Sequence, residues 1–137
     1  MRGSAFVAVA LAMTTVACGR EEDERRLTGL CTTPNEHCIN VTIVANTIKV
    51  DNPELHLLRP NHKIYWQLTA PGYEFPRNGV VMPDDPNPEF PDCHPEHAGQ
   101  IYSCKALNGK PGYKYKYTIN LSGAPTVAPL DPWIYND

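Results

Sequence analysis

The chain has 137 residues, with 15 acidic and 12 basic side chains, a formal net charge of −3, 14 prolines and five cysteines. A chain of this length forms one domain around a single hydrophobic core. Its balance is acidic, and Lys110, Lys114 and Lys116 form the one close basic group, so the composition excludes a nucleic-acid-binding protein.

The amino-terminal residues have the pattern of a secretion signal. Arg2 precedes an almost uncharged run from Ala5 to Ala17, which is thirteen residues long and ends shortly before Arg20. A membrane-spanning helix needs about 20 consecutive apolar residues. The run is therefore predicted to be a leader that is removed, not a permanent membrane anchor.

The segment Thr15–Cys18 resembles the lipobox of bacterial lipoproteins, with small Ala17 before the cleavage site and Cys18 as the lipid acceptor. The resemblance implies that residues 1–17 are removed and that Cys18 becomes the lipid-bearing first residue, which anchors the protein to a membrane of the cell envelope. Gly19 stands where an aspartate would retain a lipoprotein at the inner membrane, so the family rule implies an outer-membrane anchor facing the periplasm. The alternatives are an ordinary secretion signal with an incidental Cys18, and a cytosolic protein.

Residues 18–29 are predicted to be a flexible tether between the lipid and the folded domain. The run Arg20–Arg26 carries high charge and no apolar residue, so it cannot bury enough surface to fold. A specific docking role for this run is the alternative. Residues 30–137 then form the domain.

Four cysteines remain once Cys18 is assigned to lipid, and four is an even number. Export would place them in an oxidising compartment where disulfides persist, and four cysteines allow three pairings. We favour Cys31 with Cys38 and Cys93 with Cys104, because the members of each pair are close in sequence and flank a proline-bearing loop.

Strand patterns dominate the rest of the chain. Apolar and polar residues alternate with the period of two that half-buried strands require. Strands are expected at residues 39–43, 47–50, 55–58, 63–68, 79–82 and 100–106, and one long central strand at 113–121. The connection 84–92 is rich in proline and acidic residues and cannot be a central strand, because proline has no amide donor. These features predict an all-β antiparallel sandwich.

The order of elements from Ile39 to Leu121 resembles a cupredoxin-type Greek-key β-sandwich. Copper-binding members carry a cysteine, a histidine and usually a methionine in one carboxyl-terminal loop. Here Cys104 stands at the cysteine position, but Asn108 and Tyr113 stand where the histidine and methionine would be. The resemblance therefore implies the fold without a complete copper ligand set. A copper-binding or electron-transfer protein remains an alternative, since thiolate and imidazole suit copper.

Residues 93–97 contain a second set of metal-ligating side chains. His94 and His97 lie three residues apart beside Cys93 and could bind zinc or copper. Pro95 prevents a regular helix there, and no third ligand is evident. We predict no resident metal or other cofactor, with His94 and His97 as the weak candidates.

Catalytic motifs are not evident in the sequence. No Gly-x-Ser-x-Gly turn is present, and the carboxylates are concentrated in the tether and the proline-rich connection, where solvation keeps them from acid–base work. A hydrolase of wall or sugar remains the enzymatic alternative. The prediction is a protein that is not an enzyme.

The sequence favours a non-catalytic envelope lipoprotein that binds a protein or an envelope component. Candidate contact residues are Tyr65, Tyr73 and Asn108 at the start of the loop 108–112, for which packing at the rim is the alternative role. The tail 129–135 is apolar enough to dock on the sandwich through Trp133 and Ile134; it could instead bind a partner. An immunity lipoprotein that neutralises a delivered toxin is a further alternative.

Overall fold

The structure is a computed structural model that describes residues 37–58 and 62–137, with only the backbone of His62. The predicted signal peptide, Cys18, the tether and Cys31 lie outside the described residues. The described part is all-β, and its helical structure is one 3-10 turn at His97–Gly99. The predicted all-β sandwich is therefore confirmed.

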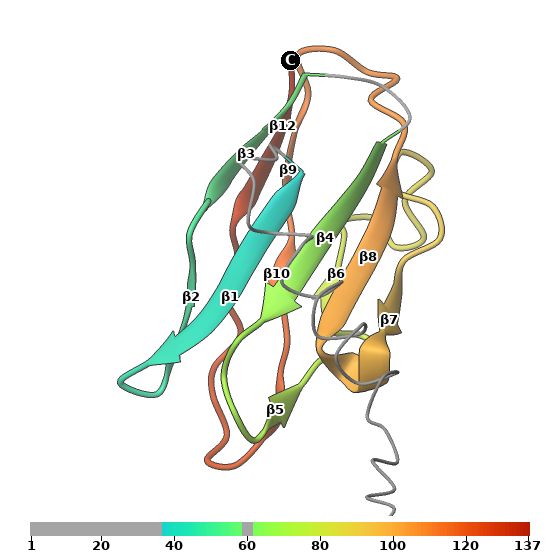
Figure 1. Ribbon diagram of the computed structural model, residues 1–137. Coiled ribbons are helices and arrows are strands. Elements are labelled where there is room, and N and C mark those ends of the chain that lie inside the picture. The colour runs from blue at the N-terminus through green and yellow to red at the C-terminus, as the bar shows by residue number, and fades with distance from the viewer. Residues whose placement is uncertain (1–36, 59–61) are drawn as a thin grey trace, which may run out of the picture.

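One layer of the sandwich is a five-stranded sheet in the order β2-β1-β4-β8-β7 (Figure 1). Its strands are β1 (Cys38–Val44), β2 (Thr47–Val50), β4 (His62–Leu68), β7 (His94–Glu96) and β8 (Ile101–Ala106). Strands β1 and β2 form a hairpin whose two turn residues, Ala45 and Asn46, have φ of 50° and 59°. Two positive φ values in a two-residue loop match the twist of paired strands.

The second layer is built from three smaller sheets. A three-stranded sheet has the order β3-β12-β9, and two pairs, β10 with β6 and β11 with β5, complete the layer. The strands are β3 (Glu54–Leu57), β5 (Tyr73–Glu74), β6 (Val80–Val81), β9 (Lys114–Lys116), β10 (Thr118–Ile119), β11 (Ser122–Gly123) and β12 (Trp133–Asn136).

The core lies between the two layers. The large sheet contributes Trp66 and its apolar neighbours, and the second layer contributes Tyr117 and Ile134, all fully buried. Trp66 Nε1 donates a hydrogen bond to Tyr117 Oη at 3.0 Å, and the two rings meet edge to face with centroids 5.5 Å apart. Burial raises the pKa of the Tyr117 hydroxyl well above its usual value, against the opposing hydrogen bond from Trp66.

Six of the predicted strand regions are strands in the structure, but two pairings differ from a purely antiparallel sandwich. Strand β1 is parallel to β4, and β12 is parallel to β3. The strands of each parallel pair are not consecutive in the chain. Between β1 and β4, for example, the chain passes through β3, which belongs to the other layer. A chain that crosses layers can return in the same direction.

The single long strand predicted for residues 113–121 is wrong. The segment forms two short strands in different sheets, with β9 paired to β12 and β10 paired to β6. At the junction, the Tyr117 amide bonds to the Pro132 carbonyl oxygen at 3.0 Å. The alternation continues through the change of partner, yet Tyr113 is 58% exposed while Tyr117 is fully buried.

Candidate binding site

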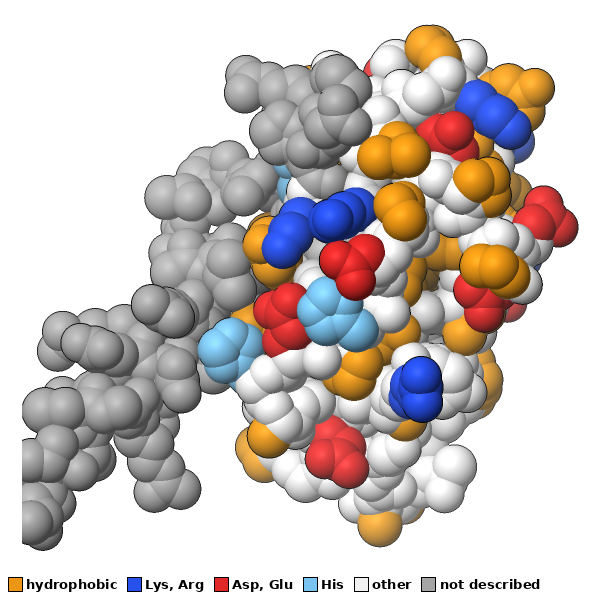
Figure 2. Space-filling model, turned by 90° about the vertical axis from the view of Figure 1, so that its right-hand side faces the viewer, with side chains coloured by type: hydrophobic (Ala, Val, Ile, Leu, Met, Phe, Trp, Pro, Cys, Tyr) orange, Lys and Arg blue, Asp and Glu red, His pale blue; other side chains and the backbone are white. Residues whose placement is uncertain are grey.

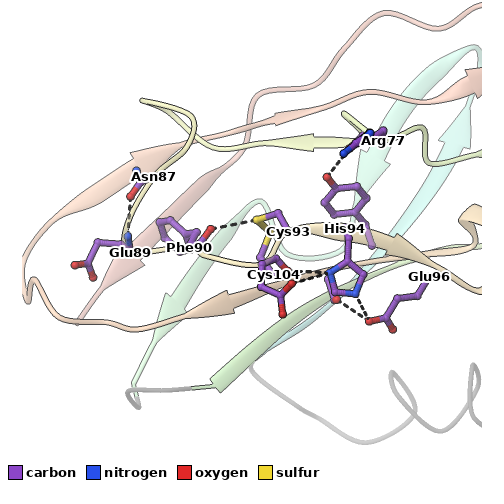
Figure 3. The surroundings of a disulfide bond; sticks show 11 residues. Arg77, Asn87, Glu89, Phe90, Cys93, His94, Glu96 and Cys104 are labelled. Carbon is purple, nitrogen blue, oxygen red and sulfur yellow. Dashed lines mark hydrogen bonds and ion pairs between the residues drawn. A yellow bond between two sulfur atoms is a disulfide. The ribbon is translucent and has the colours of Figure 1, made fainter.

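The predicted disulfide between Cys93 and Cys104 is present and joins the start of β7 to β8 (Figure 3). Cys38 is also disulfide-bonded, and its predicted partner Cys31 lies outside the described residues. Because Cys104 is oxidised, it offers no thiolate at the position of the copper-ligating cysteine.

His94 belongs to a polar cluster at the β7 edge of the large sheet. Its Nε2 lies 2.9 Å from Glu96 Oε1, and its Nδ1 lies 3.0 Å from the Asp92 carbonyl oxygen (Figure 3). The buried Ser103 hydroxyl donates to the same Glu96 oxygen at 2.9 Å. Figure 2 shows this side of the molecule, where histidine, acidic and basic side chains gather. Both ring nitrogens of His94 are thus engaged within the protein.

The structure does not bring His94 and His97 together as metal ligands. His97 lies in the 3-10 turn with φ of 51°, followed by Ala98 with φ of 53°. Within residues 37–58 and 62–137, no three His, Cys, Asp or Glu side chains converge in a way that could hold a metal ion.

The three predicted contact residues lie apart from one another. Tyr65 is half-buried on the outer side of the large sheet, beside Ser103 of β8. Tyr73 is in β5, and its hydroxyl donates to the Pro125 carbonyl oxygen. Asn108 is in the loop after β8, at the opposite end of the sandwich from β5 (Figure 1), and its Nδ2 donates to the Leu57 carbonyl oxygen at 3.1 Å. Tyr73 and Asn108 therefore use their polar groups to hold loops.

A set of rings and charges covers the outer side of the β3-β12-β9 sheet, and it includes part of the tail 129–135, which was predicted to dock on the sandwich or to bind a partner. Ile134 does dock in the core, but Trp133 lies on the opposite, outer side of β12. The strand registers place two rows of side chains side by side, because directly paired residues share a face. One row runs across the sheet through Glu54, Trp133 and Lys116, and the other runs through His56, Tyr135 and Lys114. We call this surface the aromatic face; it consists of Glu54, His56, Lys114, Lys116, Trp133 and Tyr135.

The rings of the aromatic face are ordered by mutual contacts. His56 stacks on Tyr135 with centroids 4.7 Å apart and planes 9° from parallel. Trp133 and Tyr135 have centroids 6.5 Å apart. Lys114 Nζ lies 5.1 Å and Lys116 Nζ lies 5.9 Å from the Trp133 ring centroid, within the range of cation–π attraction.

Charge is divided across the aromatic face. The two lysines, both exposed, lie on the β9 side of Trp133 and Tyr135. Glu54 lies on the β3 side, together with Asp137, whose Oδ2 is 2.8 Å from His56 Nδ1. The rings thus form a central strip with cations on one flank and carboxylates on the other.

Local sequence explains which side chains reach this face. In β12, Ile134 is fully buried and Asn136 nearly so, while Trp133 and Tyr135 are half-buried on the opposite side. The same alternation in β9 turns both lysines outward. The signal in the sequence was the Trp-x-Tyr and Lys-x-Lys spacing, but only the sheet register shows that these segments are neighbours.

A cavity of about 780 Å³ lies beneath the proline-rich connection, close to the disulfide. Its lining includes Arg77, Met82, Asp85, Phe90, Cys93 and Tyr102. Tyr102 donates its hydroxyl to the Arg77 carbonyl oxygen at 2.7 Å, and burial raises the pKa of this hydroxyl. The lining mixes apolar and charged groups.

Comparison with known proteins gives no relative: no protein-family model matches the chain, and no curated protein matches it significantly. None of the helical structure in the described residues is long and apolar enough to cross a membrane.

Proposed function

We propose that this protein is a lipid-anchored protein of the cell envelope and that its β-sandwich is a non-catalytic binding module. The lipid would be attached to Cys18 after removal of residues 1–17, and an outer-membrane position facing the periplasm fits Gly19. The domain would meet a protein or another envelope component through the aromatic face.

The observation that carries the binding role is the contrast between the aromatic face and the other polar clusters. The His94 and Glu96 groups are bonded to each other and to Ser103, so that cluster is closed upon itself. The aromatic face instead presents half-buried rings and exposed lysines on a sheet. Aromatic residues held on a rigid scaffold and surrounded by polar groups are typical of recognition surfaces.

A catalytic role has less support. Ser103 is buried and bonded to a carboxylate, not to a histidine base, so the cluster lacks the order of nucleophile, base and orienting group that hydrolysis needs. Copper electron transfer gains no support either, since the sulfur of Cys104 is bonded to Cys93.

The anchor is tested by the intact mass of the protein recovered from its own cells. Cleavage before Cys18 with added acyl chains is expected, and Cys18→Ser is expected to lose both the lipid and retention in the membrane fraction. An uncut leader or an unmodified Cys18 sulfur would refute the anchor.

The binding role is tested separately by sedimenting the Cys18→Ser protein with washed cell envelopes. The variant is expected to bind them, and a further Trp133→Ala change should reduce the bound fraction about tenfold. Tyr113→Ala is the matched control, because Tyr113 is an exposed tyrosine outside the aromatic face. Equal sedimentation of the Trp133 variant and the control would refute a role for this face.

A further inference from the structure

We propose that the ligand of the aromatic face is an acidic saccharide, a stretch of glycan whose sugar rings carry carboxylate groups. This inference rests on the proposed binding role and names the chemical class that the face would recognise.

The central strip of rings suits the faces of sugar rings. A pyranose ring presents C–H bonds on its faces and hydroxyls at its edge, and the electron-rich face of an aromatic ring attracts those C–H groups. Trp133 and Tyr135 project from alternate positions of β12, about 7 Å apart along the strand. Their centroids are 6.5 Å apart with planes tilted by 38°, and His56 covers one face of Tyr135, so a saccharide chain would stack on Trp133 and extend to the other face of Tyr135.

The polar flanks match the edge of such a ligand. Glu54 and Asp137 can accept hydrogen bonds from sugar hydroxyls, and His56 is fixed between the Tyr135 ring and Asp137. A flat apolar partner would cover the Glu54 carboxylate without giving it a hydrogen bond, which costs free energy. A polyhydroxylated ligand supplies that hydrogen bond.

The lysine flank supplies the acidic preference. Lys114 and Lys116 are both exposed and lie near the Trp133 ring, so both ammonium groups stand beside a sugar stacked there. Exposed cation–π contacts are weak, so each ammonium can turn to a carboxylate at small cost. A charge-assisted hydrogen bond to a carboxylate is stronger than a neutral one.

A lipid surface fits the face less well. An anionic bilayer spreads its charge over a plane and would repel Glu54 and Asp137 while it attracts the two lysines, whereas a saccharide chain can turn its carboxylates to the lysine flank alone. The rings of Trp133 and Tyr135 are also half-buried in the sheet, which limits insertion among lipid chains.

The test is isothermal titration calorimetry of the detergent-free Cys18→Ser protein, which has no lipid to insert into vesicles, with defined probes. The acidic probes are oligosaccharides of galacturonate and of mannuronate and wall fragments that contain N-acetylmuramate. The neutral probes are maltotetraose and chitotetraose, and phosphatidylglycerol vesicles represent the lipid surface. At least one acidic probe is expected to bind about tenfold or more tightly than both neutral ones, with affinity that falls as salt is added.

Two variants separate the contributions. Trp133→Ala is expected to weaken acidic-probe binding about tenfold, with Tyr113→Ala unchanged. Lys114→Glu with Lys116→Glu should remove the preference for acidic over neutral probes, and this pair lies on the surface, where it leaves the core intact. Lys49→Glu, an exposed lysine on β2, is the matched control and should bind as the wild type does.

Equal affinity for acidic and neutral probes, undiminished binding by Trp133→Ala, or binding to vesicles alone would overturn the inference. Failure of every acidic probe while envelope sedimentation still depends on Trp133 would refute the ligand class and leave the binding role standing. If no acidic probe binds and envelope sedimentation does not depend on Trp133, both the ligand class and the binding role of the aromatic face are refuted.

Discussion

The buried hydrogen bond between Trp66 and Tyr117 offers a direct test of how the core is held. Both side chains are fully buried, and Trp66 Nε1 donates to Tyr117 Oη at 3.0 Å. Tyr117→Phe removes only the acceptor oxygen and keeps the ring. The indole N–H would then lie in the apolar core without this partner, so we expect a loss of about 1–3 kcal/mol in the free energy of unfolding.

The assay is urea unfolding with the disulfides intact, followed by circular dichroism. With a urea dependence of about 1–3 kcal/mol per molar for a small domain, a loss of about 2 kcal/mol lowers the midpoint by about 0.7–2 M. The slope should not change, because the surface exposed on unfolding stays the same. Tyr113→Phe is the matched control; Tyr113 is 58% exposed, and its change should stay within about 0.5 kcal/mol.

A Tyr117→Phe variant as stable as the control would refute this reasoning. It would mean that the Trp66 N–H finds another acceptor or that the core relaxes around it. Either result would remove the bond as a determinant of how the two layers pack.

Three further outcomes follow from the same core and its loops. Burial raises the pKa of Tyr117, so near pH 10 the unfolded chain releases this proton while the folded protein keeps it. The free energy of unfolding should therefore be unaffected by this group below about pH 10 and should fall by about 1.4 kcal/mol per pH unit above it. Urea titrations from about pH 9 to 11 measure this loss, which Tyr117→Phe should remove. Replacing Cys93 and Cys104 with serine opens a link of sequence separation 11 and should lower the unfolding free energy by about 2–3 kcal/mol, measured in urea. Gly123→Ala should lower the melting temperature more than Gly72→Ala does. A Cβ at residue 123 would lie 2.6 Å from the Gly72 carbonyl oxygen, whereas a Cβ at residue 72 would meet nothing within 4 Å. Equal losses in melting temperature would contradict this prediction.

Local alternation was enough to place most strands. Residues 39–43 and 63–68 alternate apolar and polar side chains, and the structure buries Ile39 and Trp66 between the layers while their neighbours in sequence face outward. Such a pattern reports which side of a strand meets the core, and this depends on each segment alone. The Cys93–Cys104 pairing was also within reach, because short loops close most easily.

Strand partners could not be predicted in the same way. Residues 113–121 alternate without interruption, so nothing in the local pattern marks the point near Tyr117 where pairing passes from β12 to β6. The parallel pairing of β3 with β12 joins segments about eighty residues apart, and only the packing of the whole domain determines it. The aromatic face depends on the pairing of β12 with β3 and with β9, which is why its residues were not grouped from the sequence.

The position of β12 links the fold to the proposed role. A terminal strand at a sheet edge would fray, but β12 is paired on both sides, and its Ile134 side chain is fully buried beneath the face. Trp133 and Tyr135 are thereby held before any ligand arrives. Since ordering side chains on binding costs about 0.5–1.5 kcal/mol for each one immobilised, a pre-ordered pair of rings lets a small ligand bind with less entropic loss. In the proposed binding role, the apolar side of β12 would contribute rigidity, and its aromatic side would provide the contact with the ligand.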